Sequence, residues 1–280
     1  VFAAKQESFL QEMEDQCRSS KEVVIYCWRG GLRSQMVGSW LSLLGFSVSL
    51  IKGGYKSYRQ WTLSELEALS KHSLFVLNGK TGAGKTQILQ WLQRNPEIGS
   101  LDLEGLACHR GSAFGALGQE APSPTQQNFE NQLAEHYQEQ KHHTHMILEL
   151  EGAIGPVVLP SSLRKAMRQA RMIMVERNLK DRIEHLVELY TRSWSPQKEE
   201  EFLERLDWLS KFISQKEKQE IRLNIRGGHF HQVTRKLLEL RYDKVYEKSL
   251  KKHATQTVKT LDLSKLKKSE TIEELKRLVS

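Results

Sequence analysis

Apolar residues in the first part of the chain fall into short runs separated by amphipathic stretches. The runs at residues 22–26 and 46–51 have the length and β-branched content of buried strands. Between them, apolar positions within residues 36–44 recur at helical spacing, and residues 57–72 read as a connecting helix. Strand, helix and strand in this order predict a βαβ unit.

The alternation continues after residue 73. An apolar run at residues 74–78 leads directly into glycine, and a helix is predicted from Thr86 through Leu92. Further strands are predicted at residues 101–103, 146–150, 172–175 and 257–261. The long charged stretch that begins at Asp181 has helical periodicity. We therefore predict an α/β protein with two domains, residues 1–72 and 73–280, the second a parallel sheet with a helical segment at about 178–252.

The composition restricts the class of protein. The 280 residues are 39% hydrophobic, and no run of eighteen apolar residues occurs, so no membrane-spanning helix is expected. The N-terminus lacks the basic-then-apolar order of a signal peptide. Three cysteines without C-x-x-C spacing argue against a disulfide framework and against a cysteine-rich zinc site, which favours a cytoplasmic protein. We expect Cys17 and Cys108 to be structural.

Metal binding is not predicted from the histidines either. His142, His143 and His145 lie beside Lys141 without a carboxylate at a fitting distance in the sequence, which indicates a solvated turn.

Positive charge is concentrated in the second part of the chain. The net charge is +8, and residues 161–280 contain 28 Lys and Arg against 18 Asp and Glu, whereas residues 1–160 contain 14 against 16. Such a basic helical segment either binds a polyanion or presents solvated helix faces.

The clearest motif is a G-x-x-x-x-G-K-[ST] phosphate-binding loop (P-loop) between a predicted strand and a predicted helix. Gly79, Gly82 and Gly84 would let the backbone N–H groups point at a phosphate, and the helix N-terminus would add partial positive charge. Lys85 would neutralise phosphate oxygens, and Thr86 could hold Mg²⁺. The motif predicts a phosphate site without specifying the phosphate compound.

Polar residues follow two of the predicted strands near this loop. Glu149 and Glu151 end an apolar strand, where carboxylates often hold a metal or its water shell. Glu104, His109 and Arg110 lie in the polar loop after another strand, a position that often carries ligand contacts. We expect one of the two strand-end glutamates, Glu151, and the three loop residues to support the phosphate site.

The second candidate site is a cysteine at the end of the first predicted strand. Cys27 is followed by Arg29, Gly30, Gly31 and Arg33 before a helix begins. Backbone N–H groups around the sulfur, the helix dipole and the two arginines would stabilise a thiolate. We therefore predict a nucleophilic cysteine in an anion-binding cradle.

Taken in order, these segments resemble one family, the bacterial tRNA 2-selenouridine synthases, in which a rhodanese domain is fused to a P-loop domain. The resemblance is carried by the cysteine segment, residues 53–59, the P-loop, residues 101–115 and Phe129-Glu130-Asn131. Weaker matches occur at Glu151, Ile154-Gly155 and Pro160, and at Tyr242-Asp243 and Tyr246.

The resemblance implies a chemistry. Family members act on 2-thiouridine at the wobble position of the tRNAs for Lys, Glu and Gln. They geranylate its sulfur from geranyl diphosphate and then replace the geranylthio group with selenium from selenophosphate. Cys27 matches the essential cysteine of the family, and the P-loop residues match its phosphate cradle. No tightly bound cofactor is implied, and Mg²⁺ could accompany the phosphate donors.

Three departures from the family pattern accompany the resemblance. The first half of a rhodanese domain is missing before Val1, so residues 1–72 are expected to be a truncated rhodanese-like domain. The family usually has Glu-Asp-Glu-Ser where this chain has Glu149-Leu150-Glu151-Gly152, and usually has Asn in place of Cys108. The changes at Leu150 and Gly152 weaken a metal-binding role for that strand end, and we predict no metal site there.

Two other functions remain open at this point. One is a P-loop kinase fused to a sulfurtransferase, and the other is a non-catalytic remnant that binds tRNA or phosphate. For a tRNA-binding protein, the candidate contacts are Arg222, Arg226, Arg235 and Lys236, which lie around a Gly-Gly pair in the basic segment.

Overall fold

The computed structural model describes residues 8, 11–13, 15, 20–119, 121–151, 153–192, 194–209, 212–244, 246 and 257–279. Cys17 lies outside these residues. The chain divides into two compact units, Val1–Ser64 and Glu65–Ser280, and the division falls within helix α3 (Gly54–Lys71).

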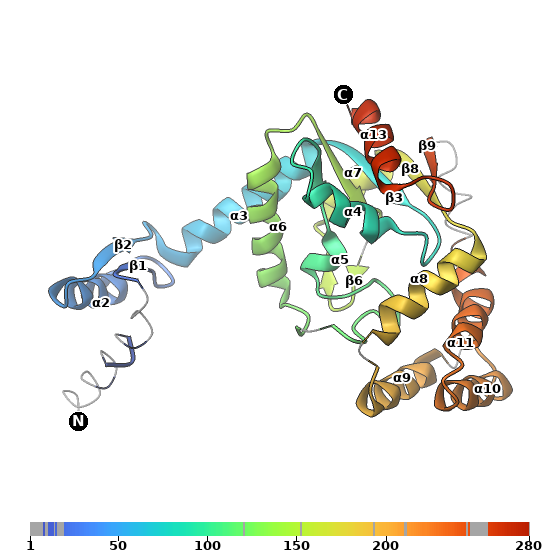
Figure 1. Cartoon of the computed structure of the whole chain (residues 1–280). Helices are drawn as coiled ribbons and strands as arrows, with labels where there is room; N and C mark the ends of the chain where they lie inside the picture. Colours follow the sequence, from blue (N-terminus) through green and yellow to red (C-terminus); the bar gives the residue numbers. More distant parts are fainter. Residues whose placement is uncertain are drawn as a thin grey trace. The chain divides into compact units, whose positions relative to one another are not determined.

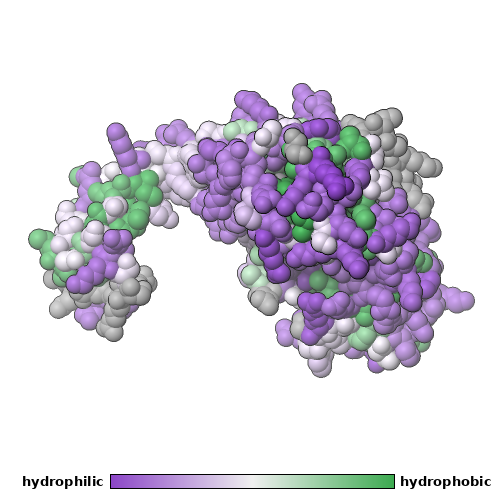
Figure 2. Space-filling view, turned by 45° about the horizontal axis from the view of Figure 1, so that its top comes forward, coloured by the Kyte–Doolittle hydropathy of each residue, from purple (hydrophilic) through white to green (hydrophobic). Residues whose placement is uncertain are grey.

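The smaller unit contains one βαβ arrangement, as the apolar pattern predicted. Strand β1 (Glu22–Ile25) pairs in parallel with β2 (Ser47–Leu50), and helix α2 (Leu32–Leu43) connects them. Several large apolar side chains of this unit are exposed, with Leu32 76% and Leu43 85% accessible. Figure 2 shows hydrophobic side chains gathered on its surface. The two strands in the described part of this unit are fewer than an independently stable sheet normally needs.

The larger unit is built on a five-stranded parallel sheet in the order β4-β5-β3-β8-β9. Strands β3, β8 and β9 of this sheet are labelled in Figure 1. The strands are β3 (Ser73–Asn78), β4 (Gly99–Leu101), β5 (His145–Glu149), β8 (Arg171–Glu176) and β9 (Thr257–Asp262). Because β3 is central and its inner residues are fully buried, it reads as a continuous apolar run, which is typical of a parallel sheet covered on both faces.

Helices cover both faces of this sheet. On one face, Phe75 and Leu77 of β3 belong to a core with helices α4 (Lys85–Gln93) and α13 (Lys268–Val279). Val76, which strand alternation places on the opposite face, is also fully buried. Helix α7 (Ser161–Gln169) contacts β3, and helix α6 (Gln126–Gln140) contacts β4. The short strands β6 (Ala153–Ile154) and β7 (Val157–Val158) form a separate hairpin.

One strand boundary expected from the sequence is wrong. The apolar residues at 101–103 predicted a strand there, but β4 ends at Leu101 and helix α5 (Leu103–Leu106) follows at once. The reason is Asp102, whose carboxylate accepts a hydrogen bond from Gly105 N at 2.8 Å and caps the new helix.

The basic segment forms a set of packed helices with its own core. The helices are α8 (Leu179–Thr191), α9 (Pro196–Trp208), α10 (Gln215–Arg226) and α11 (Phe230–Leu237), followed by the π-helical turn η2 (Leu238–Tyr242). Phe114 from the loop after α5 stacks on Phe202 of α9 with ring centroids 4.6 Å apart, which ties these helices to the sheet. None of the helices in the described ranges combines the length and the apolar character that crossing a bilayer requires.

Candidate active site

The P-loop, residues 79–86, connects β3 to α4, which is the strand–loop–helix context that the motif requires. Gly82 and Gly84 have positive φ angles of +79° and +106°, a conformation that favours glycine. At Gly79 the reason for glycine is space, since a Cβ there would lie 2.3 Å from Val175 O of β8. The loop is therefore held by its backbone geometry and by its close packing on the neighbouring strand.

Lys85 lies partly buried at the start of α4. Its Nζ donates to Gly79 O at 2.8 Å and lies 5.3 Å from the centroid of the Tyr246 ring. Burial lowers its pKa, but Tyr246, Glu104 and Glu151 together outweigh burial and raise the pKa above 10.5. The ammonium group is thus charged at neutral pH and already directed along the loop on which a phosphate would bind.

Four carboxylates lie beside the P-loop. Thr86 Oγ1 donates to Glu104 Oε2 at 3.0 Å, and Glu104 N donates to Glu149 Oε1 at 2.6 Å. Glu149 is 1% exposed, and its second oxygen has no hydrogen-bond partner in the described part of the chain. Burial, together with Asp102 and Glu104, raises the pKa of Glu149 well above its usual range.

Glu151 is the carboxylate best poised to exchange a proton. Burial raises its pKa to about 7, although the nearby Lys85 charge opposes the change. Thr86 and Glu104 present oxygen atoms of the kind that Mg²⁺ accepts at a phosphate site. Within the described ranges, no group of three or more His, Cys, Asp or Glu side chains is arranged to hold a metal ion by itself.

The loop after α5 is positioned by His109 and Arg110. His109 is 9% exposed and lies against two glycines, since a Cβ on Gly115 would be 2.5 Å and one on Gly155 2.7 Å from the ring. Its Nδ1 accepts from Gly111 N at 3.1 Å, and burial together with Arg205 and Arg110 lowers its pKa. The neutral His109 ring thus packs between Gly115 and Gly155 and holds the loop after α5 in place.

Arg110 is tied down in the same loop. Its Nη1 donates to Leu117 O at 2.8 Å, and its guanidinium lies 5.1 Å from the centroid of the Tyr190 ring. Cys108 has a φ of +47°, the left-handed region that residues other than glycine and asparagine rarely adopt.

A contact network that sequence reasoning left without a role joins the P-loop to the segment after η2. The Tyr246 hydroxyl accepts from Gly79 N at 3.1 Å and donates to Asn78 Oδ1 at 2.8 Å. Arg182 of α8 is 3% exposed, and it donates to both oxygens of Asp243 at 3.0 and 2.6 Å and to Thr81 O at 2.9 Å. The helical segment is therefore fastened directly to the phosphate loop.

Cys27 lies in a loop that a second glycine turn supports. A Cβ on Gly54 would lie 2.0 Å from Cys27 O and 2.4 Å from Gly30 N, so the two turns approach backbone to backbone. Tyr55 N donates to Cys27 O at 3.0 Å. Gly30 itself has a φ of +63°, which glycine adopts without strain.

The sulfur accepts hydrogen bonds from two groups. Ser34 Oγ lies 3.4 Å and Gly31 N 3.3 Å from Cys27 Sγ. The Ser34 hydroxyl lowers the thiol pKa most, partial burial opposes it, and backbone N–H groups lower it further, giving a pKa of about 6. Arg29 and Arg33 are both exposed, and the groups that lower the pKa are this hydroxyl and the backbone, rather than the guanidinium charges that the sequence suggested.

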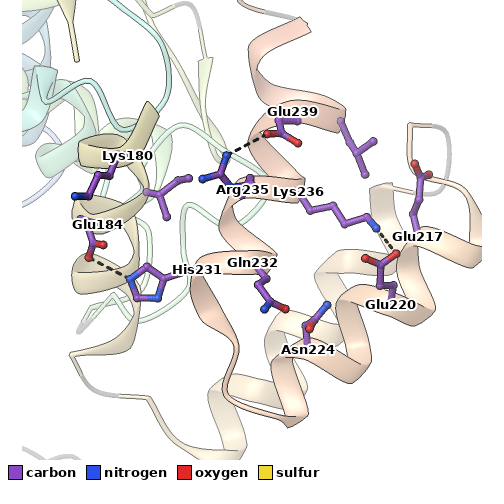
Figure 3. A pocket seen from close by; sticks show the side chains of 12 residues that line it. Lys180, Glu184, Glu217, Glu220, Asn224, His231, Gln232, Arg235, Lys236 and Glu239 are labelled. Carbon is purple, nitrogen blue, oxygen red and sulfur yellow. Dashed lines mark hydrogen bonds and ion pairs between the residues drawn. The ribbon is translucent and has the colours of Figure 1, made fainter. Parts of the chain in front are cut away.

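The four basic candidates for tRNA contact differ in their surroundings. Arg222 donates to Asp207 Oδ1 at 2.5 Å, while Arg226 is exposed in the last turn of α10. Arg235 and Lys236 line an open groove of about 770 Å³ between α8, α10 and α11 (Figure 3). There Arg235 pairs with Glu239 at 3.7 Å, and Lys236 pairs with Glu220. Arg226 is therefore the residue of the four whose charge is most accessible to a phosphate.

Comparison with known proteins identifies the family. The family model described as tRNA 2-selenouridine synthase AAA domain matches residues 72–274, more than half of the chain. The chain belongs to the tRNA 2-selenouridine synthase family. The matched region includes the P-loop, the carboxylates and the helical segment, whereas the Cys27 loop lies before it.

Curated relatives carry the same name. The tRNA 2-selenouridine synthase of Nitrosomonas eutropha is 40% identical over 188 residues, which cover 65% of this chain and 47% of the relative. That of Shewanella piezotolerans is 41% identical over 175 residues, with 60% and 46% covered, and that of Hahella chejuensis is 40% identical over 190 residues, with 66% and 48% covered. The chain spans about half the length of the curated relatives it matches. No solved structure matches it.

Proposed function

We propose that this tRNA 2-selenouridine synthase family member takes part in converting wobble 2-thiouridine in the tRNAs for Lys, Glu and Gln to 2-selenouridine. The observation that carries the proposal is the partly buried, charged Lys85 on a P-loop, in a family whose relatives are named for this reaction. A basic helical segment fastened to that loop by Arg182 and Asp243 supports tRNA as the second substrate.

The proposed reaction has two transfers. The sulfur of 2-thiouridine attacks C1 of geranyl diphosphate, a carbon–sulfur bond forms, and diphosphate leaves with the electron pair of the carbon–oxygen bond. Selenium from selenophosphate then forms a bond to C2, and the geranylthio group leaves C2 as geranylthiol. Water breaks the selenium–phosphorus bond and takes up the phosphate. Both donors carry phosphate, so the P-loop serves them without hydrolysing ATP.

The residues have distinct parts in this proposal. The P-loop N–H groups and Lys85 would hold the donor phosphate and stabilise the diphosphate as it leaves. Glu151, with a pKa of about 7, would exchange a proton beside it. Thr86 and Glu104 would hold Mg²⁺, which would offset the negative charge of the donor phosphates. The Cys27 thiolate in its hydrogen-bonded loop would attack C2 of the geranylated nucleoside, forming a C2–S bond as geranylthiol leaves, and selenium from selenophosphate would then displace the thiolate from C2.

A reaction with the purified full-length protein tests this function. The protein is incubated with tRNA that carries 2-thiouridine, geranyl diphosphate and selenophosphate, and the nucleosides are measured by mass spectrometry. We expect geranylated 2-thiouridine without selenophosphate, and 2-selenouridine when both donors are present. Phosphorylation of a small molecule by ATP, with no change in the tRNA, would favour a kinase fused to a sulfurtransferase.

Lys85→Ala tests what the Lys85 charge contributes to phosphate binding, separately from the backbone N–H groups of the P-loop. Since the substitution removes the charge but leaves the backbone N–H groups, we expect geranyl diphosphate binding to weaken by roughly 2–3 kcal/mol. Calorimetric titration measures the change, and Lys71→Ala, an exposed lysine of α3, serves as the control. Equal affinity in wild type and Lys85→Ala, with the fold retained, would place the donor elsewhere.

A further inference from the structure

A row of aromatic side chains begins at the Cys27 loop and continues along helix α3. The ring of Trp28, the residue after Cys27, has its centroid 5.5 Å from that of Tyr55. The Tyr55 and Tyr58 centroids are 5.9 Å apart, and the Tyr58 and Trp61 centroids are 5.5 Å apart. All of these residues belong to the smaller unit, so the row is formed within one compact part of the chain.

Two local features produce this aromatic row. Tyr55, Tyr58 and Trp61 are spaced three residues apart, which makes their side chains neighbours on the surface of α3. At the start of that helix, Lys56 N donates to Trp28 O at 3.0 Å and so joins the helix to the cysteine loop. The row therefore begins beside the reactive sulfur.

The rings of the aromatic row are accessible to a ligand. Trp28 is 53% exposed, and the other three rings are half-buried. Neighbouring ring planes are inclined by 36° or 37°, so the rings do not stack face to face on one another. Apolar surface of this kind gains free energy when a flat partner removes it from water.

The surroundings of the aromatic row are basic. Residues 23–63 contain no Asp or Glu and five basic residues, Arg29, Arg33, Lys52, Lys56 and Arg59, although the net charge of residues 1–160 is slightly negative. The first four of these side chains are exposed. Because the guanidinium charges of Arg29 and Arg33 are not what lowers the pKa of Cys27, their presence calls for a different anion.

Aromatic rings among basic side chains match the chemistry of single-stranded nucleic acid. Unpaired bases stack on such rings with little sequence preference, while Lys and Arg bind the phosphates. A duplex keeps its base faces covered, so the rings gain nothing from it. The combination therefore favours an unpaired RNA segment.

We propose that Trp28, Tyr55, Tyr58 and Trp61 form a stacking surface for the unpaired bases that flank the reacting uridine in a tRNA loop. The inference rests on the proposed function and deepens it, because it gives the smaller unit a part in binding tRNA as well as the thiolate. The four are positioning residues. Their ring faces hold the flanking bases so that the target nucleoside lies at Cys27.

Removal of single rings tests this assignment. Trp28→Leu and Tyr58→Leu replace a ring with an aliphatic group, whereas Trp28→Phe and Tyr58→Phe keep an aromatic face. Trp208→Leu is the matched control, because Trp208 is 70% exposed and lies on α9 in the larger unit. Binding of labelled oligouridine, and of the same oligomer annealed to oligoadenosine, to the full chain is measured by fluorescence polarisation at several salt concentrations.

Each leucine variant is expected to bind oligouridine about fivefold or more weakly than wild type, as for one lost base stack, and to bind the duplex unchanged. The phenylalanine variants should retain most of the affinity, and Trp208→Leu should match wild type. Because stacking is not ionic, the slope of log affinity against log salt should stay the same in the leucine variants. Lys56→Ala should instead lower that slope by about 0.7 for a single strand.

Three results would overturn the stacking role. They are unchanged oligouridine affinity in the leucine variants, an equal loss for the duplex, and a loss in the phenylalanine variants as large as in the leucine variants. The pH midpoint of Cys27 alkylation by iodoacetamide shows whether the cysteine loop is intact. If Trp28→Leu shifts that midpoint, Tyr58→Leu decides, because Tyr58 lies on the helix and not in the loop.

The outcome is separable from that of the proposed function. If oligouridine binding depends on the rings but the full-length protein makes no 2-selenouridine, the stacking surface stands and the proposed function fails. If Trp28→Leu and Tyr58→Leu form 2-selenouridine with the KM of wild type for tRNA, the stacking assignment alone fails.

Discussion

The chemistry of individual residues in this chain is set by hydroxyl groups and backbone conformations close to them. Cys27 owes its low pKa to Ser34 and to the N–H groups of a tight loop. The pKa of Glu149 is raised by burial and by the neighbouring carboxyl groups of Asp102 and Glu104. At this scale the sequence selected Cys27 and Glu151 as candidates but did not predict all of the groups that shift their pKa values, since residue types alone do not determine the hydrogen bonds around a sulfur atom.

Ser34→Ala should raise the pKa of the Cys27 thiol from about 6 toward 9.0, because it removes the hydrogen bond that favours the thiolate most. The thiolate would then form at higher pH. The rate of alkylation of Cys27 by iodoacetamide would therefore rise at a higher pH in Ser34→Ala than in wild type. Mass spectrometry of the Cys27 peptide measures that rate. Ser39→Ala on the exposed face of the same helix is the control, and an unchanged midpoint in Ser34→Ala would contradict this account.

Glu149→Gln tests whether the buried carboxylate is protonated. Because the folded-state pKa is raised, ionisation of Glu149 in the unfolded chain reduces stability as pH rises above its usual pKa of 4.5 toward the folded value. The neutral amide should therefore leave the free energy of unfolding at pH 8 equal or higher, and flatten its dependence on pH. Urea denaturation at pH 6 and pH 8 measures both, and a lower stability at pH 8 than wild type would show that the charged form is the native one.

At the scale of elements, the sequence predicted the strands well because each central strand is an apolar run buried on both faces. It predicted the strand–P-loop–helix order for the same reason. It placed the boundary after β4 wrongly because Asp102 caps a helix, and it did not anticipate the π-helical turn η2 or the network beyond it. Tyr246 lies 167 residues from Gly79 along the chain, and no local pattern could link them.

Asp243→Ala tests the fastening of the helical segment to the P-loop. It leaves the buried guanidinium of Arg182 without its carboxylate, which should lower the free energy of unfolding by roughly 3–5 kcal/mol. The backbone at Thr81 would be less firmly held, so pyrophosphate affinity should fall as well. Glu188→Ala, which breaks the exposed pair with Arg192 on the same helix α8, is the control and should change little. If Asp243→Ala and Glu188→Ala both lower the free energy of unfolding only slightly, the Arg182–Asp243 pair does not hold the helical segment to the P-loop.

At the scale of the whole molecule, the uneven charge of the sequence was compatible with a polyanionic partner and with solvated helix faces, and the structure distinguishes among the basic residues. Arg222 shares Asp207 with the buried Lys218, which makes it a structural cation at the junction of α9 and α10. Arg226 is exposed. Sequence composition could not make this distinction because it depends on which acids the fold brings near each base.

Arg226→Ala should therefore lower the slope of log tRNA affinity against log salt by about one unit or slightly less, as expected for one lost phosphate contact. Arg222→Ala should lower the free energy of unfolding and leave that slope closer to the wild-type value. Filter-binding titrations of tRNA at several salt concentrations measure the slopes. Equal slopes for wild type and Arg226→Ala would remove this end of α10 from the tRNA interface.

The central claim is that a P-loop and a thiolate loop act together in selenium transfer to tRNA. It is tested most directly by mass spectrometry of wobble nucleosides from cells that lack the full-length gene and then regain it as wild type, Cys27→Ser or Lys85→Ala. The account predicts that 2-selenouridine disappears on deletion and returns with wild type. It should not return with Cys27→Ser, where geranylated 2-thiouridine can still form, and Lys85→Ala should diminish both nucleosides. Persistence of 2-selenouridine in the deletion strain, or its full return with both variants, would contradict the account.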